Sequence, residues 1–190
     1  MTTTSPHLEP PPWPHCAVGA SPDDPVGCRG HLVDSYDTCL AHLPEVLRAT
    51  YLAGLAPETE VILSGTTFTG DLLQRLLRAL RDPNSEQLLV RQARFEAATF
   101  TDTADFGGVA FGDVWFDGAV FSGDAVFRGA SFAGSAGFRG ASFAGSAGFR
   151  GASFAGSAGF SRAVFSRAAD FSGAVFSLDA RFDNASFEIG

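Results

Sequence analysis

The sequence predicts a mainly β protein in which short strands stack into a solenoid, and two features lead to this prediction. Phenylalanine supplies 19 of the 190 residues, whereas tyrosine and tryptophan supply two each. The residue two places before a phenylalanine is alanine in 16 of the 18 units of a C-terminal repeat, and valine in the other two. A period this regular indicates a repeat architecture. The phenylalanines of the repeat stand at positions 95, 100, 106, 111, 116, 121, 127, 132, 138, 143, 149, 154, 160, 165, 171, 176, 182 and 187.

The spacing of five or six residues excludes a helix and favours a coil of short extended segments. Five residues turn an α-helix by roughly 500°, so successive phenylalanines would point about 140° apart and form no stripe. In an extended segment, by contrast, the alanine and the phenylalanine two residues later share one face. The glycines that follow can turn a corner without strain. Coils built this way stack at about 4.8 Å, with phenylalanine above phenylalanine in the interior.

Part of the repeat consists of near-identical copies. The segment Gly129–Arg139, GASFAGSAGFR, recurs at 140–150 and at 151–161, where Ser161 replaces the final arginine. Duplication of this kind extends a scaffold and does not by itself create a unique pocket. It therefore favours a structural or binding role over catalysis.

The chain before the repeat divides into three segments. Residues 1–12 are rich in threonine and proline and are predicted to be a disordered tail. Residues 13–43 hold all three cysteines and three of the four histidines. Residues 44–92 are predicted to be a helical segment that caps the repeat, which occupies 93–190.

Two helices are expected in the capping segment. Pro44 suits a first helical position, and Val46, Leu47, Tyr51 and Leu52 follow it. A short strand-like run, Val-Ile-Leu, lies at 61–63. The second helix carries a leucine stripe expected to cover Phe95 and Phe100, because an exposed terminal coil presents unpaired backbone edges. The stripe consists of Leu72, Leu73, Leu76, Leu77 and Leu80.

The cysteines and histidines have the spacing of metal ligands. Cys28 precedes His31, and Cys39 precedes His42, by two intervening residues each, which lets both members of a pair reach one ion. Cys16 is a further candidate. Two other interpretations stay open: the cysteines could be buried small apolar residues, or Cys39 could be a nucleophile with His42 as its base. An odd number of cysteines in a chain without a secretion signal disfavours a disulfide framework.

The repeat resembles the pentapeptide-repeat family, whose unit is A-(D/N)-(L/F)-x-x. The segment Ala-Ser-Phe-Ala-Gly at 130–134 matches that frame, and the resemblance covers 93–190. It implies a right-handed quadrilateral β-helix with four units per coil, or about 4.5 coils. The extra residue in alternate units would enlarge the coil from 20 to 22 residues. The all-phenylalanine centre is similar to a Phe-rich actinobacterial type.

The amino-terminal segment resembles the region that precedes such Phe-rich repeats. Its Trp-Pro-His-Cys at 13–16, Gly-Cys-Arg-Gly at 27–30 and Cys-Leu-Ala-His at 39–42 are the matching motifs. The resemblance implies a structural zinc site made by Cys16, Cys28, Cys39 and His42. His31 is the substitute ligand.

Charge and composition narrow the function. The net charge is −8 and lysine is absent. Within 13–43 the single arginine, Arg29, faces four aspartates, so direct nucleic-acid binding is disfavoured. No apolar run is long enough to cross a membrane, and no signal segment is evident, so a cytoplasmic protein is expected.

These features predict a non-catalytic structural or interaction protein whose rigid solenoid presents flat faces to a protein partner. The repeat brings no catalytic constellation together, and an enzyme is not expected. The alternative is a regulator of a topoisomerase, since some members of the resembled family protect DNA gyrase by imitating duplex DNA. That alternative asks for carboxylates along one face, yet residues 128–161 contain none. A homodimer through the carboxy-terminal coil is a further expectation.

Overall fold

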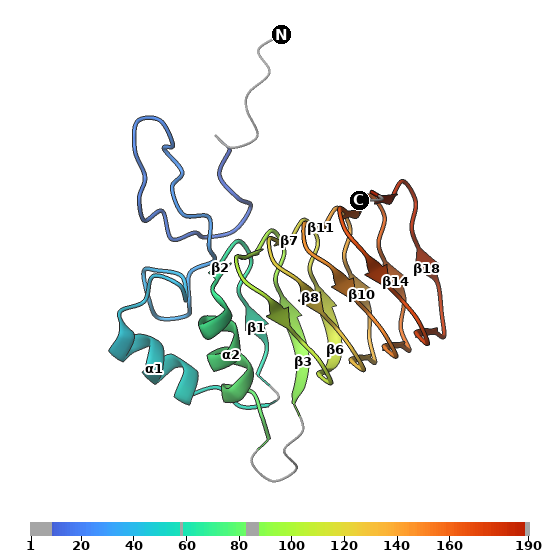
Figure 1. The fold of residues 1–190 in the computed structure, drawn as a ribbon. Coiled ribbons are helices and arrows are strands. Elements are labelled where there is room, and N and C mark those ends of the chain that lie inside the picture. The colour runs from blue at the N-terminus through green and yellow to red at the C-terminus, as the bar shows by residue number, and fades with distance from the viewer. Residues whose placement is uncertain (1–8, 58, 83–87, 189–190) are drawn as a thin grey trace.

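The computed structural model describes residues 9–57, 59–82 and 88–188, and it forms a β-solenoid of about four turns with two helices at one end (Figure 1). The helices are α1 (Glu45–Ala53) and α2 (Gly70–Ala79). The largest sheet contains β1 (Val61–Ile62), β3 (Leu89–Arg94), β6 (Ala110–Trp115), β9 (Ser131–Phe132), β10 (Ala136–Gly137), β13 (Ser153–Phe154), β14 (Ala158–Gly159), β17 (Val175–Phe176) and β18 (Ala180–Arg181). A second sheet contains β2 (Thr67–Phe68), β4 (Thr99–Phe100), β7 (Val120–Phe121), β11 (Ser142–Phe143), β15 (Val164–Phe165) and β19 (Ser186–Phe187). A third contains β5 (Ala104–Asp105), β8 (Ala125–Val126), β12 (Ala147–Gly148) and β16 (Ala169–Asp170).

The strand register confirms the predicted coil. Strands of successive coils pair in parallel, as Val120 of β7 does with Ser142 of β11 and Ser142 does with Val164 of β15. The step between paired residues is 22 along the chain from β7 onward, whereas the earlier steps, from β3 to β6, β4 to β7 and β5 to β8, are 21. Residues at equivalent positions of successive coils are paired in each case, so they lie above one another.

The core is a set of four phenylalanine columns. All 19 phenylalanines of the chain belong to them. Within a column, neighbouring rings are 4.5–5.2 Å apart between centroids and within 14° of parallel. Rings of adjacent columns meet edge to face or at an intermediate tilt, as Phe138 does with Phe149 at 90° and with Phe143 at 39°. The stacked and edge-to-face geometries are both favourable for aromatic quadrupoles, so the columns support one another.

The sheets begin at Val61, within the segment expected to cap the repeat, and the strand-like run at 61–63 contributes β1. Val61 of β1 pairs with Ala93, and Phe68 of β2 stacks on Phe100. The segments VILSG and TTFTG at 61–70 are thus two early repeat units, with Leu63 and Phe68 at their centres. Val90 of β3 occupies the corresponding position opposite Phe111 of β6. Helix α2 stands where the remaining side of this first coil would be.

Helix α2 closes the first coil with its leucine stripe. Its N-cap is Thr69, whose side chain accepts a hydrogen bond from the backbone N–H of Leu72. The carboxylate of Asp102, on the next coil, accepts another from the N–H of Gly70 at 2.9 Å. The five leucines are buried in the same hydrophobic core as Phe95 and Phe100. They are Leu72, Leu73, Leu76, Leu77 and Leu80.

Helix α1 is less deeply packed than its sequence suggests. It begins at Glu45 with Pro44 as the N-cap, one residue later than expected. Of its apolar side chains Leu52 is buried, but Val46 is 76% exposed. In the described part of the chain, neither helix is long and apolar enough to span a membrane.

The ends of the chain bear on two further expectations. Most of the tail predicted over 1–12 lies outside the described residues. Ile189, in the carboxy-terminal coil that is expected to form a homodimer, lies outside them as well. At the end of the solenoid far from the helices, Phe187 is 53% exposed, and Val175 and Leu178 are exposed as well.

The glycines of the coil offer a matched test of its geometry. Gly129 has φ of +65°, Gly159 has an ordinary φ, and no atom lies within 4 Å of where a Cβ would stand at either position. We expect Gly129→Ala to lower the free energy of unfolding by about 1–2 kcal/mol, because an L-residue is strained in the left-handed region. Gly159→Ala should leave it unchanged or raise it by up to about 1 kcal/mol. Urea denaturation checks both, and equal effects would refute the left-handed corner assigned to Gly129.

Candidate metal centre

The cysteine and histidine segment is held together by a short antiparallel pairing of its backbone. The N–H of Cys16 donates to the carbonyl of Gly30, and the N–H of Cys28 donates to that of Val18, each at 2.9 Å. The indole of Trp13 donates to the carbonyl of Arg29 at 2.8 Å. These bonds place Cys16 and Cys28 side by side, although 11 residues separate them.

The same segment docks against the first coil of the solenoid. The N–H of His31 donates to the carbonyl of Ser64 at 2.7 Å. Gly65, in the next position, has φ of +64°, and a Cβ there would overlap the carbonyl oxygen of Arg29. The hydroxyl of Ser64 donates to the carboxylate of Glu96 at 2.7 Å, which fixes this corner to the following coil. The docking therefore depends on a close approach between two backbones.

Four side chains converge at this junction: Cys16, Cys28, Cys39 and His42. Their ligand atoms all lie within 4.8 Å of one another, so they are close enough to bind a metal ion. Sγ of Cys28 is 3.7 Å from Sγ of Cys39. Nδ1 of His42 is 3.4 Å from Sγ of Cys16 and 3.4 Å from Sγ of Cys39.

These separations fit the edges of a coordination tetrahedron. With Zn–S near 2.3 Å and Zn–N near 2.0–2.1 Å, tetrahedral angles put two sulfurs about 3.8 Å apart, and a sulfur and a nitrogen about 3.6 Å apart. The observed edges are 3.7 Å and 3.4 Å. A Cys₃His donor set also suits zinc chemically, since thiolate and imidazole are its preferred ligands. Such a set leaves no position for a reactive water and is typical of a structural site.

The pKa values of Cys28 and Cys39 are shifted in opposite directions. A hydrogen bond from the Cys39 thiol, together with the Gly30 N–H and the nearby charge of His42, lowers the pKa of Cys28 despite its partial burial. The same interaction, and then burial, raises the pKa of Cys39. The pair therefore holds one thiolate readily, on Cys28, and the second thiol needs a positive ion to lose its proton.

The other candidates from the sequence lie elsewhere. His31 is not part of the four-residue cluster; its Nδ1 is 2.7 Å from the carbonyl oxygen of Leu32. The three cysteines form no disulfide. Cys39 does contact His42, but Cys39 is 0% exposed, so a substrate has no access to its sulfur. The geometry therefore gives no support to a nucleophilic role.

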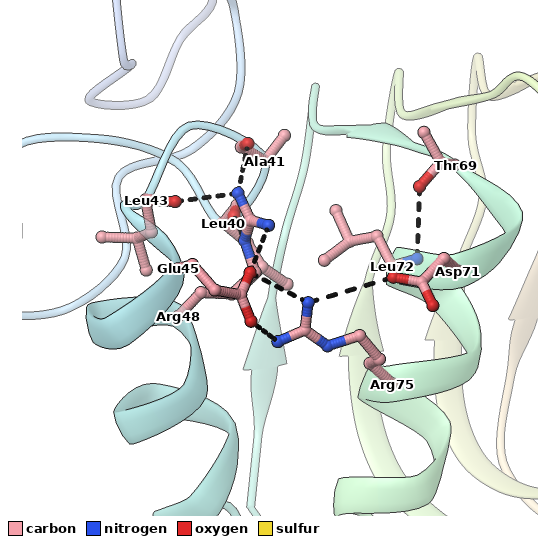
Figure 2. Close-up of polar contacts among 9 residues, drawn as sticks. All are labelled: Leu40, Ala41, Leu43, Glu45, Arg48, Thr69, Asp71, Leu72 and Arg75. Carbon is pink, nitrogen blue, oxygen red and sulfur yellow. Dashed lines mark hydrogen bonds and ion pairs between the residues drawn. The ribbon is translucent and has the colours of Figure 1, made fainter.

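Arg48 of α1 holds the turn that carries Cys39 and His42 (Figure 2). Its guanidinium donates hydrogen bonds to three backbone carbonyls of that turn: those of Leu40 at 3.1 Å, Ala41 at 2.9 Å and Leu43 at 2.8 Å. A planar group with several donors can satisfy three carbonyls at once. The spacing of the ligands gave no sign of this residue.

An ion-pair network joins α1 to α2 at the same place (Figure 2). Glu45 accepts from Arg48 at 3.2 Å and from Arg75 of α2 at 2.6 Å. Arg75 also lies 3.9 Å from the carboxylate of Asp71. The network links the turn of the metal cluster, through α1, to the helix that closes the solenoid.

Arg48 and Arg75 provide matched substitutions on one carboxylate. We expect Arg48→Ala to lower the free energy of unfolding by about 2–3 kcal/mol, because it leaves three carbonyls of the turn without a donor. Arg75→Ala removes a solvent-exposed ion pair and should have a much smaller effect. Arg48→Lys should recover less than half of the loss, since an ammonium cannot span three carbonyls. Chemical denaturation measures all three, and equal losses for Arg48→Ala and Arg75→Ala would contradict this role.

Comparison with protein families identifies the repeat. The model for pentapeptide repeats (9 copies) matches residues 90–131, 116–164 and 149–189. Comparison with curated proteins found no match, and comparison with solved structures found none either. The matched ranges together span more than half of the chain and coincide with the stacked coils. The chain therefore belongs to the pentapeptide-repeat family.

Proposed function

We propose that this protein is a non-catalytic interaction scaffold: a zinc-organised amino-terminal module closes one end of a phenylalanine-cored solenoid, and a flat solenoid face binds a protein partner. The observation that supports it most is the position of the side chains that can bind a metal ion. In the described residues, the metal-competent cluster is the closed Cys₃His set at the junction of the module and the first coil. A closed set is suited to holding structure.

Zinc is the proposed ion. The observed edges of 3.4 Å and 3.7 Å, the three thiol ligands and the antiparallel framework that presents them support this choice. Ligands of the cluster come from three separate stretches, around Cys16, Cys28 and Cys39. Because a bound ion would join all three, its binding free energy would contribute to the stability of the module.

The two Cys-x-x-His pairs provide an internal control for the metal. Protein made without a polyhistidine tag should contain about one equivalent of zinc, and chelation should lower the melting temperature by about 5–10 °C. His42→Ala should lose most of the zinc, whereas His31→Ala should retain it, since His31 lies outside the cluster. Elemental analysis and thermal unfolding check these results. A content below about 0.3 equivalents of zinc per chain in the wild type would refute the zinc site.

The solenoid faces differ in charge, and this difference favours one of them for the partner. The outward positions of the six-stranded sheet β2–β4–β7–β11–β15–β19 are uncharged from Thr67 to Ser186. The two adjoining faces carry charges, for example Asp117 beneath Arg139. The opposite face, which includes β9, β13 and β17, is also uncharged at its outward strand positions, but its uncharged run is shorter, because its first coil presents Arg91. The core of a protein interface is depleted in charged residues. We therefore assign the partner to the six-stranded face.

Duplication in the sequence makes this assignment testable with matched variants. Ser142 and Ser153 occupy the same position in two copies of GASFAGSAGFR, but Ser142 lies on β11 of the six-stranded sheet and Ser153 on β13 of the largest sheet. Arginine is tolerated at this position of the repeat, as Arg181 shows. Ser142→Arg should abolish recovery of the partner from native lysate, whereas Ser153→Arg should preserve it. The assignment would be overturned if Ser153→Arg alone abolished recovery of the partner, or if both variants still recovered it.

Regulation of a DNA topoisomerase is the second candidate, and the charge pattern supports it less well. A DNA mimic needs carboxylates along one face at the spacing of phosphates. The column that begins with Asp117 continues with Arg139 and Ser161 before Asp183. A gyrase supercoiling assay separates the two candidates: inhibition by the wild type at micromolar excess would favour the regulator, and no effect would remove it.

A further inference from the structure

Thr66 is an exception within the repeat. It lies two residues before Phe68, the inward-facing position that small apolar side chains fill in the repeat units. The same position on the coils above is filled by alanine at 98, 119, 141 and 163. Thr66 is 0% exposed. The first coil thus places a hydroxyl where the rest of the column has a methyl group.

This hydroxyl has no hydrogen-bond partner among the described residues. Among the described residues, Oγ1 of Thr66 is a fully buried side-chain oxygen without a hydrogen bond. The backbone of Thr66 is satisfied: its N–H donates to Leu63 and its carbonyl accepts from Thr99. A buried hydroxyl that makes no hydrogen bond is destabilising, so alanine would serve better here if only packing mattered. The Thr66 hydroxyl is therefore a hydrogen-bond donor that could bind an acceptor placed next to it.

A ligand of the metal centre is a candidate acceptor close to this hydroxyl. A Cβ placed on Gly30 would lie 2.8 Å from Sγ of Cys39, 2.7 Å from its Cβ and 3.3 Å from Oγ1 of Thr66. The thiol and the hydroxyl therefore border the same small space, which stays open because residue 30 is glycine. Any side chain at position 30 would stand between them.

The chemistry of the centre calls for such a donor. Three thiolates and one divalent cation leave a net negative charge, and hydrogen bonds to the sulfurs disperse it. Cys28 receives one from the N–H of Gly30 at 3.4 Å. Cys39 is fully buried, so water cannot supply the corresponding bond.

We propose that the Thr66 hydroxyl donates a hydrogen bond to the Cys39 thiolate of the loaded metal centre, with Gly30 leaving the path open. Thr66 is thus a positioning residue that couples the first coil of the solenoid to the centre. This inference rests on the proposed zinc site. It assigns a role to an otherwise unfavourable hydroxyl.

The test uses three substitutions of Thr66 in the full-length protein, with Thr67→Val on the outward face as control. Zinc affinity is measured by competition with a chromophoric chelator, and the sulfur-to-metal charge-transfer band by cobalt substitution. Thr66→Val and Thr66→Ala should weaken zinc binding by about tenfold or more and shift the band. Thr66→Ser, which keeps the hydroxyl, should stay within about threefold of the wild type with an unshifted band, as should Thr67→Val.

Thr66→Ala also separates this role from a purely structural one. It restores the alanine of the column and removes the unpaired hydroxyl, so the metal-free protein should unfold at the same denaturant concentration as the wild type, or at a higher one. Unchanged affinity and band in Thr66→Val, or a Thr66→Ser that behaves like Thr66→Val, would overturn the inference alone. A wild type that binds neither zinc nor cobalt would overturn the proposed zinc site together with it.

Discussion

The vertical stacking of phenylalanine on phenylalanine, one coil height apart, is the constraint on which the rest of the molecule depends. Strand pairing fixes the rise between coils at about 4.8 Å, and the rings follow at 4.5–5.2 Å, close to the best distance for offset aromatic stacking. Backbone hydrogen bonding and side-chain packing thus demand the same spacing. The stack accommodates a 21-residue step between the early coils, since Phe100 and Phe121 still stack at 4.8 Å, and it keeps a 22-residue step from β7 to β19.

A stack of this kind has an open end wherever it begins, and the first coil shows how the end is closed. Helix α2 takes the place of one side and buries five leucines against the aromatic core. The cysteine and histidine segment then covers the corner at Ser64 and Gly65. The metal cluster therefore lies at the place where the repeat gives way to irregular structure. An ion that joins three stretches of chain would supply there what strand pairing supplies elsewhere.

The sequence predicted the periodic part of this structure well and the irregular part incompletely. A phenylalanine at every fifth or sixth residue is compatible with a coil of short strands and not with a helix, so the spacing alone predicted the solenoid. The first coil was missed because Leu63 and Val90 replace phenylalanine and α2 interrupts the period. The four clustered residues were named by the resemblance of the amino-terminal motifs, because spacing alone offered His31 as readily as His42. Arg48 and Thr66 were not, since their partners are backbone carbonyls and a buried void that only the folded chain brings together.

The near-identical copies in residues 129–161 have a consequence for how such a chain can change in length. Each copy is 11 residues long, which is half a coil. Recombination that gains or loses one 11-residue copy would rotate all the following coils by half a turn about the solenoid axis. Their outward faces would then be exchanged. Gain or loss of two copies, which make one whole coil, would leave every face in place and alter only the height of the solenoid. The reach of this scaffold can therefore be adjusted genetically in whole coils while its surface pattern is inherited intact.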